Sequence, residues 1–177
     1  ILAGSNAGML HAFDFADGSE TWAFIPPSML SSLRQVVSNN SGTTNAIYGV
    51  DGSPVVKDIY YGGSWRTVAL TGLGRGGNSY FALDITDTQN PVHLFTFQND
   101  PLNEIVFHWD ASGNKTIHEY GPGKTIDPEY DFSELGESWS TPRILRMRIS
   151  GDDKWVAVFG GGFNNNTTSD YVSAVYV

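Results

Sequence analysis

Residues 68–84, Val-Ala-Leu-Thr-Gly-Leu-Gly-Arg-Gly-Gly-Asn-Ser-Tyr-Phe-Ala-Leu-Asp, decide the fold of this chain. The glycines satisfy the G-x-G-x-x-G spacing of a dinucleotide site, but such a site needs a helix directly after the glycines. Tyr80–Ile85 is instead aromatic and apolar, as is typical of a strand. We therefore predict a tight turn between two strands, in which glycines adopt positive φ angles.

The same unit occurs again along the chain. A downstream copy lies 88 positions away without a gap, and an upstream copy lies 68 to 70 positions away. The downstream matches are Ser53-Pro54 with Thr141-Pro142, Gly63 with Gly151, Val68-Ala69 with Val156-Ala157, and Gly72 and Gly74 with Gly160 and Gly162. The upstream matches are Leu2 and Gly4 with Leu70 and Gly72, and 12–14 with 82–84.

Repeated small sheets, each with glycine and aromatic residues at recurring positions, are typical of a β-propeller. Blades usually repeat every ~40–50 residues, so the longer spacings here predict insertions. We therefore predict an all-β chain that is a segment of about three blades from a larger propeller. The blade-like units are 1–25, 51–97 and 139–177, and the long inter-strand insertions are 26–50 and 98–138. Strands are expected at 12–15, 53–61, 65–71, 80–85, 92–97, 142–149 and 154–159, and one helix at 28–37.

Both ends of the chain lie inside apolar runs, so we expect a piece of a longer protein. We also expect four tryptophans, Trp22, Trp65, Trp139 and Trp155, to pack between sheets.

Composition excludes several classes of protein. The 177 residues carry 19 acidic and 10 basic side chains, a net charge of −9, which argues against nucleic-acid binding. The absence of cysteine excludes disulfides and cysteine-ligated metals. No apolar run reaches the ~18–20 residues of a transmembrane segment. Nine carboxylates and two lysines give the insertion 98–138 a net charge of −7. We expect function to lie in this insertion first, and the alternative is a solvated, mobile loop.

Asp127, Glu129 and Asp131 alternate as at the start of a calcium loop. Such a loop also needs Gly and Glu where this chain has Phe132 and Ser138, so the three residues are weak metal candidates, and a solvated acidic run is the alternative.

Gly123-Lys124-Thr125 lacks the first glycine of a phosphate-binding loop, and the four histidines form no catalytic motif. No catalytic or cofactor-binding residue is predicted.

Read together, four stretches resemble the C-terminal propeller of the PilC/PilY family, bacterial type IV pilus tip and biogenesis proteins. They are 50–54, 61–68, 71–77 and 80–87. The stretch 4–14 resembles the preceding blade of that family and also the quinoprotein-type repeat. The stretches 135–142 and 155–164 resemble the next blade.

This resemblance implies a non-enzymatic pilus-tip component that supports pilus biogenesis, surface adhesion and twitching motility. Its implied partners are minor pilins, other pilus-tip proteins, and a receptor on a host or abiotic surface. Its implied location is the bacterial cell surface, at the pilus tip and in association with the outer membrane. The family's calcium site would lie beyond Val177, so calcium is implied only for the full-length propeller. The alternative is a propeller fragment of a quinoprotein-type dehydrogenase.

Overall fold

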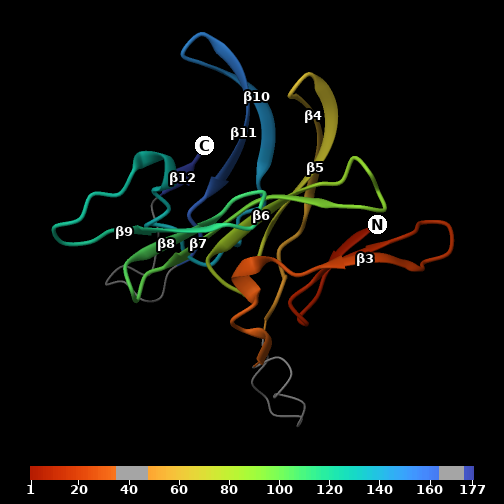
Figure 1. Ribbon diagram of the computed structural model, residues 1–177, viewed down its shortest axis with the longest axis horizontal. Helices are drawn as coiled ribbons and strands as arrows, with labels where there is room; N and C mark the ends of the chain where they lie inside the picture. Colours follow the sequence, from red (N-terminus) through yellow and green to blue (C-terminus); the bar gives the residue numbers. More distant parts are fainter. Residues whose placement is uncertain (35–47, 164–173) are drawn as a thin grey trace.

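The computed structural model describes residues 1–34, 48–163 and 174–177, which form three antiparallel sheets (Figure 1). The first sheet contains β1 (Leu2–Gly4), β2 (Leu10–Phe13) and β3 (Glu20–Phe24). The middle sheet runs in chain order through β4 (Val55–Tyr61), β5 (Ser64–Gly72), β6 (Ser79–Asp84), β7 (Val92–Asp100), β8 (Ile105–Trp109) and β9 (Lys115–Glu119). The third sheet contains β10 (Arg143–Ile149), β11 (Asp152–Gly160) and β12 (Val175–Tyr176). Two short 3₁₀ helices, η1 (Pro27–Met29) and η2 (Pro128–Tyr130), complete the named elements.

The predicted all-β class is confirmed, and the seven expected strands are present with ends shifted by at most three residues. The expected helix 28–37 is found in part: a 3₁₀ helix occupies Pro27–Met29, residues 33 and 34 are α-helical, and residues 35–37 lie outside the described residues. The sheets have three, six and three strands because β8 and β9 arise from the insertion 98–138 and extend the edge of β7.

The middle sheet is covered on both faces. One apolar cluster, around Leu73, Phe81 and Leu83, packs against the first sheet. The other, around Leu70 and Tyr80, packs against the third sheet. All six residues of β6 are buried, as expected for a strand enclosed on both sides. The three sheets therefore pack face to face in series, like adjacent propeller blades.

The glycine-rich run forms the predicted turn between β5 and β6, with φ angles of 58° at Gly74 and 147° at Gly77. Glycine is also needed here for close backbone contact. A Cβ atom on Gly72 would lie 2.7 Å from the carbonyl oxygen of Ser138, and one on Gly52 would lie 2.2 Å from the carbonyl oxygen of Gly72. The turn is thus where segments leading into neighbouring sheets meet.

The tryptophan prediction is partly wrong. Trp22 and Trp155 are half-buried against neighbouring sheets, but the side chains of Trp65 and Trp139 are 64% and 48% exposed. Trp65 lies at the tip of the β4–β5 hairpin, beyond the packed part of the sheet. The buried tryptophan that the sequence did not reveal is Trp109, on β8.

Within the described residues, no helix has the length and apolar character needed to cross a membrane.

Candidate functional site

The acidic insertion 98–138 is an ordered extension of the middle sheet. After β7, β8 pairs antiparallel with β7, and β9 pairs with β8. Val106 is fully buried and Trp109 is nearly so, which anchors the hairpin to the sheet. The chain then returns across the sheet as the segment 120–138. The acidic side chains are therefore carried on a fixed frame.

Asn99 fixes the returning segment. Its side chain is 2% exposed, and its Nδ2 donates to the carbonyl oxygens of Ser133 at 2.9 Å and Leu135 at 2.8 Å. Its Oδ1 accepts from the hydroxyl of Tyr120 at 2.8 Å. Burial raises the pKa of Tyr120 to about 12, so the hydroxyl keeps its proton as a donor at neutral pH.

Phe132 is the apolar anchor of this segment. Its ring stacks on the ring of Phe97, with the ring centroids 3.8 Å apart and the ring planes at 9° to each other. The ring of Tyr176 lies beside it, with the ring centroids 5.1 Å apart. The Phe132 ring lines an apolar groove of about 640 Å³ between the middle and third sheets. Glu129 and Asp131 line the same groove, which therefore combines mostly apolar side chains with two acidic ones.

The structure places the three metal candidates on or beside η2. The Oδ1 atom of Asp127 accepts from the Glu129 amide at 3.0 Å and caps η2. The Oδ1 atom of Asp131 accepts from the amide and hydroxyl of Ser133 at 3.2 and 2.6 Å. Across residues 1–34, 48–163 and 174–177, no group of three or more histidine or carboxylate side chains is placed to hold a metal ion. Metal binding by these residues stays a prediction.

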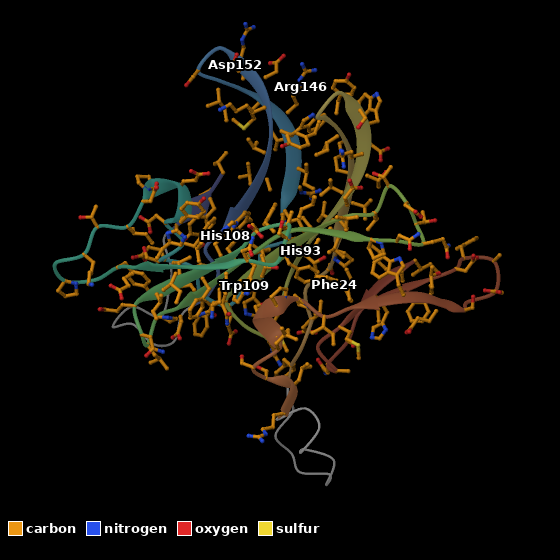
Figure 2. The ribbon with its side chains drawn as sticks, viewed as in Figure 1. Phe24, His93, His108, Trp109, Arg146 and Asp152 are labelled. Carbon is orange, nitrogen blue, oxygen red and sulfur yellow. The ribbon has the colours of Figure 1, made fainter. Side chains whose placement is uncertain are left out.

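Three histidines of the middle sheet pack against aromatic rings of other elements. His108 and His118 contact the ring of Tyr130, with centroids 5.1 and 4.1 Å away. Burial lowers the pKa of His108, and the nearby His118 lowers it further. His93 stacks on Phe24 at 5.8 Å, and burial lowers its pKa as well (Figure 2). Two of these imidazoles, His93 and His108, therefore favour the neutral form.

Ser138 closes the insertion onto the glycine-rich turn. Its hydroxyl accepts from the Leu73 amide at 2.8 Å and donates to the carbonyl oxygen of Gly77 at 2.9 Å. The Gly76 amide is bonded to the carbonyl oxygen of Leu73. Because these turn amides have internal partners and a strand follows, the turn is not built as a phosphate cradle. Asn99 and Ser138 were missed from the sequence, where each is a single polar residue that belongs to no motif.

The chain resembles known proteins along its whole length. The family model described as the PilY1 beta-propeller domain matches residues 1–177. "Type IV pilus biogenesis factor PilY1" of Pseudomonas aeruginosa strain PAO1 is 35% identical over 166 residues, which are 93% of this chain and 11% of that protein. A PilY1 homolog of Xylella fastidiosa is 32% identical over 165 residues, 93% of this chain and 9% of that protein.

A solved structure is similar as well. The crystal structure of the Pseudomonas aeruginosa PilY1 C-terminal domain matches with a TM-score of 0.56 and 33% identity, over 92% of this chain and 25% of that one. The chain therefore spans about a tenth of the length of these full-length relatives and a quarter of the solved domain.

Proposed function

Because the chain belongs to the PilY1 beta-propeller family, we propose that it is a non-catalytic part of a pilus-tip protein and supports type IV pilus assembly through protein contacts. Relatives named as type IV pilus biogenesis factors support this role. The proposal extends to surface adhesion and twitching motility, and to exposure at the cell surface, where pili operate. Calcium binding by the full-length propeller belongs to the proposal too, with no ligand assigned in this chain.

Contact with a partner protein is supported above all by the fixed acidic segment, residues 120–138. Asp127, Glu129, Asp131 and Glu134 are all exposed, and the backbone between them is held by Asn99 and Phe132. A preorganised charged surface gains more from a complementary partner than a mobile one, because less ordering entropy is lost on binding. We infer that the partner is a minor pilin or another pilus-tip protein that presents basic groups.

The test replaces these four acidic residues with their amides, Asp→Asn and Glu→Gln, in the natural protein that contains this chain. Amides keep a hydrogen-bond acceptor for the local turns but remove the charge. The matched control changes four exposed aspartates outside the insertion, Asp14, Asp17, Asp87 and Asp152, to asparagine. We expect fewer surface pili, counted as sheared pilin, with the first variant only. Equal pilus numbers for the two variants, at equal protein levels, would overturn the contact proposal.

A dehydrogenase is the competing function. The purified natural protein should give no quinone-dependent dye reduction above a blank. Sustained dye reduction with a quinone cofactor would favour the enzyme instead.

A further inference from the structure

The tips of two hairpins enclose a second cavity, separate from the acidic insertion. The β4–β5 and β10–β11 hairpins stand side by side at the top of Figure 1. The cavity between them has a volume of about 280 Å³ and is lined by Tyr60, Trp65, Arg146, Asp153 and Trp155. This size lies just below the ~300–1,000 Å³ range for drug-sized ligands. It suits one compact ring.

The aromatic part of the cavity is held in place by the hairpin. Tyr60 and Trp65 are paired across β4 and β5, next to the turn formed by Gly62 and Gly63. Their rings meet edge to face, with centroids 5.7 Å apart and planes at 68°. Tyr60 is 53% and Trp65 64% exposed, so the core does not require their size. Rigid exposed aromatic faces of this kind are suited to contact with a ligand.

The polar part comes from the neighbouring hairpin. Nη2 of Arg146 donates to Oδ2 of Asp153 at 2.7 Å, and both side chains are about half exposed. Figure 2 shows Arg146 on the side of β10 that faces the β4–β5 hairpin. A guanidinium has five N–H donors and a carboxylate has two acceptor oxygens, so the pair keeps both donors and acceptors for a ligand. The pairing holds these groups in one orientation.

We propose that this cavity binds a neutral sugar ring of a surface glycan. A pyranose has an apolar C–H face, which packs on an aromatic ring, and hydroxyl groups at its edge, which both donate and accept hydrogen bonds. Trp65, Tyr60 and Trp155 supply the aromatic surface, and Arg146 and Asp153 supply the hydrogen bonds. Sialylated and sulfated sugars are disfavoured by the Asp153 carboxylate, which lines the cavity.

This inference rests on the proposed surface adhesion and names its ligand class. It does not involve the acidic insertion, so its failure can be told apart from failure of the assembly role. Variants of the cavity should leave pilus numbers unchanged, whereas the four-amide variant should lower them.

The experiment uses the purified natural protein on an array of neutral, sialylated and sulfated glycans. Methyl glycosides of glucose, galactose and mannose are then titrated, with binding followed by saturation-transfer NMR. We expect neutral glycans to bind. We expect Trp65→Ala and Arg146→Ala each to weaken that binding by roughly tenfold or more, the loss of one stacking or charged contact. Trp65→Phe should retain part of it.

The matched control is Trp139→Ala, which removes a tryptophan of similar exposure outside the cavity and should leave binding unchanged. Thermal unfolding of every variant checks the fold. Three results would each overturn the proposal: no neutral glycan or glycoside bound, a preference for sialylated or sulfated glycans, or equal affinity of the Trp65→Ala and Trp139→Ala proteins.

Discussion

The hydroxyl of Tyr80 on β6 donates to the carbonyl oxygen of Ser140 at 2.7 Å and joins the middle sheet to the segment that enters the third sheet. Tyr80 has no exposed surface, and burial raises the pKa of its hydroxyl well above the ordinary value. The Ser140 hydroxyl in turn accepts from the Gly160 amide on β11 at 2.9 Å. One serine thus connects two consecutive sheets.

Tyr80→Phe should therefore lower the free energy of unfolding by about 1–2 kcal/mol, because it leaves the half-buried Ser140 carbonyl without this donor. Tyr61→Phe is the control, since Tyr61 is 69% exposed and the same atom is removed. Chemical denaturation of the natural protein measures both variants. A Tyr80→Phe protein as stable as the control would show that the bond contributes nothing to the junction.

Gly72→Ala should destabilise the same junction by about 1–3 kcal/mol. The added Cβ would lie 2.7 Å from both the Ser138 carbonyl oxygen and a ring carbon of Tyr80, so backbone or a buried ring has to move. Gly160 occupies the equivalent position of the next repeat, but a Cβ there would meet only the Ser140 side chain, at 3.7 Å. Gly160→Ala is thus the matched control and should change stability by less than ~0.5 kcal/mol. Equal melting temperatures for the two variants would contradict this account of the turn.

Asn99→Ala should free the returning acidic segment. It removes the side chain that makes three hydrogen bonds at a buried site, two as donor and one as acceptor. The free energy of unfolding should fall by about 2–3 kcal/mol. Hydrogen exchange should become faster at residues 131–136 and stay unchanged in β4 and β5. Asn90→Ala, at an exposed turn, is the control. Unchanged exchange at 131–136 would show that Asn99 does not hold the segment.

Asp84 should make stability depend on acid pH. Burial raises the pKa of this carboxyl, but bonds from the Thr86 hydroxyl and amide and from Arg66 outweigh burial, and the net pKa lies below 3.8. A lowered folded-state pKa means that the stabilisation is complete above pH ~3.8 and is lost as the pH falls through the folded value. Asp84→Asn should flatten the dependence of the melting temperature on pH in that window. Asp152→Asn controls for the loss of one exposed negative charge. Parallel curves for the natural protein and Asp84→Asn would refute the linkage.

The repeat could be predicted from the sequence because glycines and apolar pairs keep fixed spacing between blades. The turn at 72–77 followed from glycine positions and from the strand-like Tyr80–Ile85. The β8–β9 hairpin was missed because it lies in an insertion with no copy elsewhere in the chain. The exposure of Trp65 was missed because hydrophobicity does not reveal that a hairpin tip projects beyond its neighbours.

The candidate site was harder to predict. The concentration of acidic residues in 98–138 was visible from the sequence, but the way they are held was not. Asn99 acts through backbone carbonyl groups of residues 34 and 36 positions away, and such partners leave no pattern in a single sequence.

We propose that the fixed acidic segment contacts a basic partner at the pilus tip. The most direct test of this contact measures affinity for purified minor pilins at low and high salt. It compares the purified natural protein with the four-amide variant, in which Asp127, Glu129, Asp131 and Glu134 are changed to Asn or Gln. We expect the four-amide variant to bind at least about tenfold more weakly at low salt, with a shallower salt dependence. Equal affinity and equal salt dependence for the two proteins would contradict the claim.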